Sequence, residues 1–243
     1  MDDAIKEQLK YLRLPILLAT WDEVIKAGTK KNPPYSQFLK EILLAEANNK
    51  TSRAKTQRRQ KAKLPENYEI STYPFSVQSK LNKKQVLEIY DSKSYLTSQQ
   101  NIALIGPTGV GKTGLAISYL INAIDNGYDG RFIIFSDLVA ELYQSVADNS
   151  TQKILKKFTN YACLVIDELG YVEVDNPAQA GLLFKLIRGR KKSTIITSNL
   201  GFDDWEKFLK NQHLTAALLN KFTANCHFIN MLQCKSITPK LIK

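Results

Sequence analysis

The stretch from Gly106 to Thr113 has residue types and spacing that suit phosphate binding. It fits the pattern G-x-x-x-x-G-K-T. Glycines let backbone N–H groups turn toward phosphate oxygens, because no Cβ obstructs the approach. Lys112 would then reach the outer phosphates of a nucleotide, and the Thr113 hydroxyl would bind Mg²⁺. The candidate nucleotide-binding residues are Gly106, Pro107, Thr108, Gly109, Val110, Gly111, Lys112 and Thr113.

Two carboxylates follow a second apolar run, at residues 162–166. Asp167 would bind Mg²⁺, and Glu168 would orient and polarise a water molecule that attacks the terminal phosphate. A third run, at residues 194–197, leads to Asn199, whose amide would sense the bound nucleotide. Alone, the acids would more simply be surface residues at a strand end and Asn199 a turn former. Their combination with the Gly-rich stretch favours the catalytic and sensing roles.

These side chains need a framework that brings the ends of several strands together. The Gly-rich stretch lies between an apolar run and a long helical pattern, which an accidental glycine-rich turn would lack. Continuous apolar runs alternate with helical patterns along the chain, which predicts a mainly parallel five-stranded sheet with helices on both faces, an α/β fold. Ligands bind at the carboxyl ends of the strands in such sheets. The expected strands are 102–105, 131–135, 162–168, 194–197 and 227–231, and two of the expected helices are 138–146 and 153–161.

The first 65 residues form a separate, basic and helical region, and residues 66–243 hold the nucleotide-binding domain. In the third expected helix, which starts near Ser36, we expect Phe38, Leu39, Ile42 and Leu43 on the buried face. Residues 50–63 then carry seven Lys or Arg residues and no acid. A solvated linker and a sequence-independent contact with DNA phosphates explain this run equally well on charge alone.

The composition excludes several classes of protein. Hydrophobic residues make up 44% and charged residues 23% of the 243 residues, as in ordinary globular chains. No apolar run approaches the roughly 20 residues of a membrane helix, and the N-terminus lacks the pattern of a secretory signal. Three cysteines without metal-ligand spacing suit reduced thiols, so we expect a cytoplasmic protein. The net charge of +11 favours a polyanionic partner.

In these motifs and in several further blocks, the sequence resembles the IstB-like helper ATPases of insertion sequences, which belong to the AAA+ superfamily and are close to DnaC-type helicase loaders. The resemblance implies an AAA+ domain that binds ATP and Mg²⁺, a DNA-binding N-terminal region, and a homo-oligomer that assembles on duplex DNA and activates or targets a transposase. The blocks that carry it, besides the Gly-rich stretch, are Leu12–Pro15, Leu43–Glu46, Ala62–Pro65, Val165–Tyr171, Ser193–Asn199 and Phe202–Trp205.

The chain also departs from the family pattern. The family has His where this chain has Gly114, and Arg where it has Lys221. That Arg reaches the nucleotide of a neighbouring subunit, and Lys lacks its two-point grip on a phosphate. The family's closing Ser-Tyr-Arg-Leu block is replaced within residues 235–243. We therefore expect ATP binding with slow hydrolysis. A replicative helicase loader and a nucleotide-gated DNA scaffold remain as alternatives.

Overall fold

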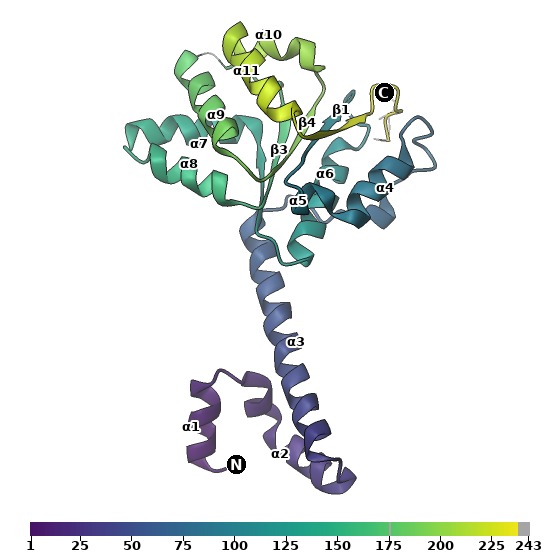
Figure 1. The fold of residues 1–243 in the computed structure, drawn as a ribbon, viewed down its shortest axis with the longest axis vertical. Helices are drawn as coiled ribbons and strands as arrows, with labels where there is room; N and C mark the ends of the chain where they lie inside the picture. The colour runs from purple at the N-terminus through teal and green to yellow at the C-terminus, as the bar shows by residue number, and fades with distance from the viewer. Residues whose placement is uncertain (175, 238–243) are drawn as a thin grey trace, which may run out of the picture. The chain divides into compact units, whose positions relative to one another are not determined.

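The computed structural model describes residues 1–174 and 176–237 (Figure 1). The chain divides into two compact units, Met1–Gln57 and Arg58–Lys243. This division falls earlier than the boundary at 65/66 that the sequence suggests, because the end of the basic stretch packs with the larger unit. Of the altered C-terminal segment, residues 238–243 lie outside the described part of the chain.

The N-terminal unit consists of helices α1 (Asp3–Tyr11) and α2 (Pro15–Lys31) and most of α3 (Tyr35–Ala62), which continues into the second unit. The Asp2 side chain accepts a hydrogen bond from the N–H of Ala4 and so caps α1. Glu46 of α3 is 8% exposed, and its Oε1 accepts a 2.7 Å hydrogen bond from the N–H of Leu17. This carboxylate of α3 lies at the N-terminal end of α2 and so also compensates the dipole of α2.

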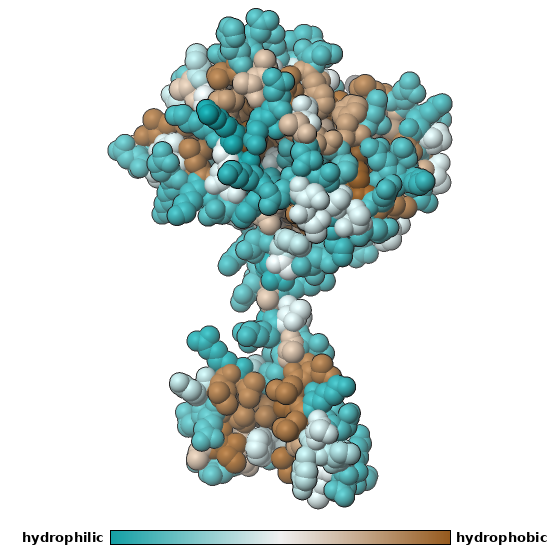
Figure 2. All heavy atoms as spheres, in the orientation of Figure 1, coloured by the Kyte–Doolittle hydropathy of each residue, from teal (hydrophilic) through white to brown (hydrophobic). Residues whose placement is uncertain are grey.

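The prediction that Phe38, Leu39, Ile42 and Leu43 form the buried face of α3 is wrong in part. Leu39 and Leu43 are 58% and 63% exposed, and Leu9 is the one fully buried hydrophobic residue of this unit among the described residues. Figure 2 shows hydrophobic side chains gathered on the surface of this unit. Three helices provide too little surface to cover every apolar stripe that they carry.

The C-terminal unit is built on a five-stranded parallel sheet with the order β2-β3-β4-β1-β5. This confirms the predicted sheet, and each strand end lies within one residue of its expected position. The strands are β1 (Asn101–Ile105), β2 (Gly130–Ile134), β3 (Cys163–Leu169), β4 (Ser193–Ser198) and β5 (Cys226–Asn230).

Helices cover both faces of the sheet, as predicted (Figure 1). Alternate residues of β1 point to opposite faces, so Ile102 and Leu104 pack with α6, while Ala103 and Ile105 pack in the cluster beneath α7, α9 and α11. The helices of this unit are α4 (Lys83–Ser92), α5 (Ser94–Thr97), α6 (Lys112–Asp125), α7 (Phe135–Ala147), α8 (Thr151–Asn160), α9 (Pro177–Gly189), α10 (Trp205–Leu209) and α11 (Gln212–Thr223), with short 3₁₀ turns at Ile70–Thr72 and Phe202–Asp204. Among the described residues, no helix has the length and apolar character to cross a membrane.

Candidate nucleotide-binding site

The Gly-rich loop, residues 106–111, connects the end of β1 to the start of α6. Gly111 has a φ of 93° and lies just before α6, where its left-handed conformation would strain any other residue. A Cβ at Gly106 would lie 2.6 Å from the backbone oxygen of Met231, which follows β5. Two of the glycines are therefore required by backbone geometry and by close packing, and the loop opens at the carboxyl edge of the sheet.

Residues from two distant segments hold this loop in place. The Tyr73 hydroxyl donates a 2.9 Å hydrogen bond to the backbone oxygen of Val110, and Gln78 Nε2 donates a 3.1 Å bond to the same oxygen. The N–H of Ile237 donates to the backbone oxygen of Gly109. Sequence reasoning missed Tyr73 and Gln78, because they lie in a stretch without a motif.

Thr113, Asp167 and Thr197 form a hydrogen-bonded group at the first turn of α6. The Thr113 hydroxyl lies 3.0 Å from both carboxylate oxygens of Asp167, and the Thr197 hydroxyl donates a 2.5 Å bond to one of them. Thr197 also accepts a 3.0 Å bond from the N–H of Glu168. The structure thus joins the two residues predicted to serve Mg²⁺, although they lie on different elements.

Burial disfavours the charged forms of Asp167 and of its neighbour Lys112. Asp167 is 3% exposed, and burial raises its carboxyl pKa above the ordinary value, although hydrogen bonds from Thr197 and Thr113 counteract the rise. Lys112 is 7% exposed, and burial lowers the pKa of its ammonium group. Its Nζ donates to the backbone oxygens of Gly106 and Pro107 at 2.7 and 2.8 Å. Asp167 and Lys112 compensate one another's charge in part, and a polyanion with a divalent cation would add to that compensation.

Glu168 points away from the protein interior. Its φ is 60°, and the pairing of β3 with β4 shifts register between Ile166 and Leu169. Such a bulge changes the direction of a side chain, so Glu168 is exposed although its neighbour Asp167 is buried. In the turn that follows, the Tyr171 hydroxyl makes a 2.8 Å hydrogen bond with the Thr108 hydroxyl of the Gly-rich loop. This second contact joins the loop to the end of β3.

A cavity of about 460 Å³ collects these groups. Its size falls within the roughly 300–1,000 Å³ of small-molecule sites. Lys112, Thr113 and Glu168 line it, as does Tyr68, whose ring is about 3.5 Å from the position of a Cβ at Gly114. The full lining is Tyr68, Glu69, Thr72, Tyr73, Pro74, Thr108, Gly109, Gly111, Lys112, Thr113, Gly114, Ser118, Glu168, Tyr171, Thr197 and Ile237.

Six of the predicted residues do not line this cavity. Four of them adjoin or are hydrogen-bonded to residues that do, namely Gly106, Pro107, Val110 and Asp167. The other two, Asn199 and Lys221, come from segments outside the Gly-rich loop and the acidic pair. Asn199 follows β4, and its Oδ1 is buried without a hydrogen-bond partner among the described residues. Lys221 is exposed in the last turn of α11 and lines a different cavity, with Arg190 and Lys192, near the starts of β1 and β4. It lies at the opposite edge of the sheet from the Gly-rich loop, so a role for Lys221 at a phosphate would require a second copy of the chain.

The residues present fit a nucleoside triphosphate with Mg²⁺. The two required glycines provide a cradle that a Cβ would fill, Lys112 supplies a cation, and Thr113 with Asp167 supplies the oxygen ligands that Mg²⁺ prefers. Across residues 1–174 and 176–237 there is no group of three or more His, Cys, Asp or Glu side chains able to hold a metal. A site of this kind leaves most of the coordination to phosphate and water.

A parallel sheet with the order 2-3-4-1-5, a Gly-rich loop after β1 and an acidic pair on β3 define an AAA+ protein of the P-loop class. The family model described as IstB-like ATP binding protein matches residues 7–237. The chain belongs to this family, which confirms the resemblance seen in the sequence, and ATP is the nucleotide that the family's description names.

Known relatives agree with this assignment. The chain is 32% identical to a protein named as an ATP-binding protein of insertion sequence IS5376 from Geobacillus stearothermophilus, over 95% of this chain and 92% of the relative. It is 30% identical to the protein named likewise for IS21 from Pseudomonas aeruginosa, over 92% of this chain and 84% of that relative. The crystal structure of the DnaC helicase loader matches 61% of this chain and 90% of its own, with a TM-score of 0.50 and 24% identity. The last match shows the AAA+ fold alone.

Proposed function

We propose that this chain is a DNA-binding helper ATPase that assembles on duplex DNA and activates or targets a partner transposase. The observation that carries the ATPase part is the contact of the Thr113 hydroxyl with the buried Asp167 carboxylate, beside the exposed Glu168. In the proposed site, Lys112 and the loop N–H groups bind phosphate oxygens, and Thr113 and Asp167 hold Mg²⁺ directly or through water. Mg²⁺ would neutralise charge on the phosphates.

Glu168 has the position and exposure that a water-orienting base needs. It lines the same cavity as Lys112, while its neighbour Asp167 is buried and hydrogen-bonded. The two adjacent carboxylates thus have different surroundings, which suit Asp167 for binding a metal and Glu168 for orienting a water molecule. Asn199 is proposed as a sensor, and its unpartnered buried Oδ1 provides an acceptor for that role.

Three observations support DNA and a transposase as partners. The net charge is +11, the stretch 50–63 contains no acid, and the relatives are named as proteins of insertion sequences. A homo-oligomer is part of the proposal, and the position of Lys221, remote from the Gly-rich loop of its own chain, supports an arrangement in which Lys221 serves the nucleotide of a neighbouring copy. A helicase loader shares the fold, and co-purification with a replicative helicase in place of a transposase would favour that function.

ATP turnover with and without duplex DNA tests the proposal. We expect turnover that rises when DNA is added and that disappears in Glu168→Gln, a variant that keeps size and hydrogen-bonding capacity but loses the base. Lys112→Ala serves as the second control and should abolish ATP binding itself. Tight Mg²⁺-dependent ATP binding without turnover in the unaltered protein would favour the nucleotide-gated scaffold, and unchanged ATP affinity in Lys112→Ala would contradict the site.

A further inference from the structure

A second cavity of the C-terminal unit is distinct from the nucleotide site and carries a strong positive charge. Its volume is about 460 Å³. Four cationic side chains and one acid, Asp129, line it, so its lining has a net charge of +3 (4 − 1). We call it the basic groove, and its residues are Arg58, Gln60, Lys61, Lys63, Asp129, Gly130, Lys157, Asn160 and Tyr161.

Arg131 adds an uncompensated charge beside this groove. It is 7% exposed, its Nε has no hydrogen-bond partner, and its NH1 reaches only the backbone oxygen of Lys61 at 3.5 Å. In the described part of the chain it forms no ion pair with an acid. Burying an unpaired charge is costly unless an opposite charge comes near. Because Lys61 and Gly130 line the groove, an anion bound there would stabilise Arg131.

The end of helix α8, whose carbonyl oxygens would repel an anion, is already neutralised. Arg190 donates hydrogen bonds to the backbone oxygens of Phe158 and Tyr161, and Lys192 Nζ donates a 2.6 Å bond to that of Asn160. These contacts compensate the negative end of the helix dipole next to the groove. Two of the last four carbonyl oxygens of α8, those of Phe158 and Asn160, and the oxygen of Tyr161 after the helix are thus already paired with cations.

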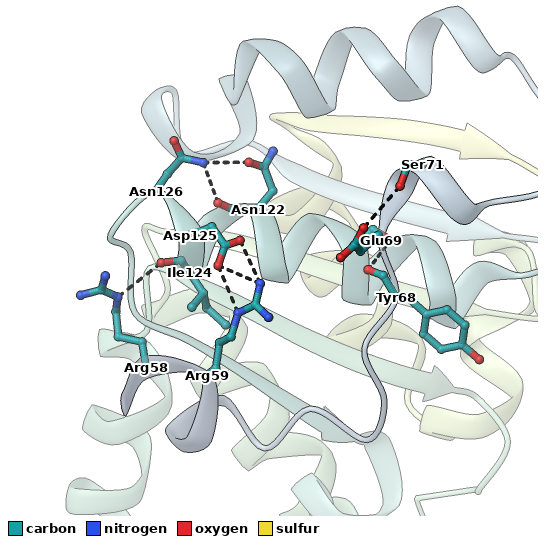
Figure 3. A network of polar contacts seen from close by, with 10 residues as sticks. Arg58, Arg59, Tyr68, Glu69, Ser71, Asn122, Ile124, Asp125 and Asn126 are labelled. Atoms are coloured by element: carbon teal, nitrogen blue, oxygen red, sulfur yellow. Dashed lines mark hydrogen bonds and ion pairs between the residues drawn. The ribbon is translucent and has the colours of Figure 1, made fainter. Parts of the chain in front are cut away.

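The neighbouring arginines at the end of α3 differ in their surroundings (Figure 3). Arg59 makes a two-point ion pair with Asp125 at the end of α6, with distances of 2.9–3.1 Å. Arg58 uses only its Nε, which donates to the backbone oxygen of Ile124 at 3.4 Å. Arg59 thus holds α3 against α6, whereas Arg58 keeps guanidinium N–H groups for a ligand in the groove.

We infer that the basic groove binds the phosphodiester backbone of duplex DNA. The inference rests on the DNA binding of the proposed function and assigns its phosphate contacts to Arg58, Lys61 and Lys63, with the buried Arg131 behind them. Successive phosphates along a strand present the repeated negative charge that four lining cations and one buried guanidinium need. Lys157 is paired with Glu141 at 2.5 Å, so the positive charge that the groove offers to phosphates comes mainly from Arg58, Lys61 and Lys63.

The test measures binding of the full-length protein to a fluorescein-labelled 30-base-pair duplex by anisotropy, over a series of salt concentrations. The double variant Lys61→Gln/Lys63→Gln removes two groove cations. Its matched control, Lys153→Gln/Lys156→Gln, removes two exposed cations of α8 that lie outside the groove. ATP binding, measured in parallel with a fluorescent analogue, verifies that both variants are folded.

We expect the groove variant to bind about tenfold more weakly at 0.1 M salt, with the slope of log K against log salt reduced by about 1.8, which is 0.9 for each lost phosphate contact. The control should change affinity less than about twofold. Equal weakening in both variants, or no weakening in the groove variant, would overturn the groove assignment. A preference for single-stranded over duplex DNA would overturn the choice of partner. Absence of duplex binding by the unaltered protein would instead contradict the proposed function.

Discussion

At the scale of single residues, Asp167 combines burial with a charge that the proposed function requires. Burial raises the pKa of its carboxyl group in the folded chain, so the native state binds this proton more readily than the unfolded chain does. By linkage, the stability that comes from this protonation is lost as pH rises through the interval between the two pKa values. At neutral pH the ionised carboxylate therefore destabilises the fold.

Asp167→Asn should consequently raise Tm at pH 7.5 in the absence of nucleotide, by about 2–4 °C for each kcal/mol gained in a chain of this size. Asn has nearly the same shape and no charge to bury. The advantage should shrink as pH falls toward the range in which Asp167 itself becomes protonated. The same variant should lose the Mg²⁺-dependent part of the stabilisation by ATP. Differential scanning fluorimetry measures both, and a lower Tm at pH 7.5 would show that the hydrogen bonds from Thr113 and Thr197 outweigh the burial of charge.

At the scale of elements, the Gly-rich loop depends on segments that no motif marks. Gln78 is 2% exposed and makes three hydrogen bonds, in which Nε2 donates to the oxygens of Val110 and Lys235 and Oε1 accepts from the N–H of Lys235. One side chain therefore joins the loop, the segment before α4 and the segment after β5. Tyr73 supports the same loop oxygen, as its hydroxyl also donates to Val110.

We expect Gln78→Leu to lower the free energy of unfolding by about 1–3 kcal/mol, since it leaves buried polar groups of Lys235 and the loop without partners. ATP affinity should fall as well, because the loop loses a support. Gln85→Leu is the matched control, since Gln85 also donates to a backbone oxygen, that of Phe228 at 3.1 Å, but on the exposed surface. Gln85→Leu should change the free energy of unfolding by no more than about 0.5 kcal/mol. Urea unfolding of both variants decides, and equal effects would contradict a special role for Gln78.

At the scale of the whole molecule, one chain does not place all the predicted catalytic groups in one site. The Gly-rich loop and Glu168 lie at the carboxyl edge of the sheet, whereas Lys221 lies with Lys191 near the starts of β1 and β4. In the proposed assembly, Lys221 would face the nucleotide of a neighbouring copy. Lys supplies a charge there but not the planar fork of Arg.

Lys221→Arg should therefore increase kcat for ATP at least about tenfold, given that arginine fingers contribute about 10³–10⁵ in related phosphoryl-transfer enzymes. The increase should appear only as protein concentration rises, since it requires a second copy. Lys191→Arg, an equal change in the same cavity, serves as the control and should leave kcat unaltered. Turnover measured across protein concentrations tests this, and a rate in Lys221→Arg that equals that of the unaltered chain at every concentration would contradict the role.

The sequence alone sufficed for the features that depend on local patterns. The Gly-rich stretch, the acids near the end of the third strand and the five apolar runs are short segments whose chemistry is complete within a few residues. The family resemblance could likewise be recognised because its blocks are continuous in the chain. Strand ends were predicted to within one residue for the same reason, since apolar side chains and turn residues change abruptly there.

Tertiary structure decided which of these residues meet, because that depends on contacts between segments far apart in the chain. It brought Thr113 to Asp167 and Gln78 to the Gly-rich loop, and it placed Lys221 at the other edge of the sheet. It also left Leu39 and Leu43 exposed, since three helices cannot cover every apolar stripe that their sequences carry. The basic groove belongs to this class too, because it is formed by α3, β2 and α8, none of which has a phosphate-binding motif.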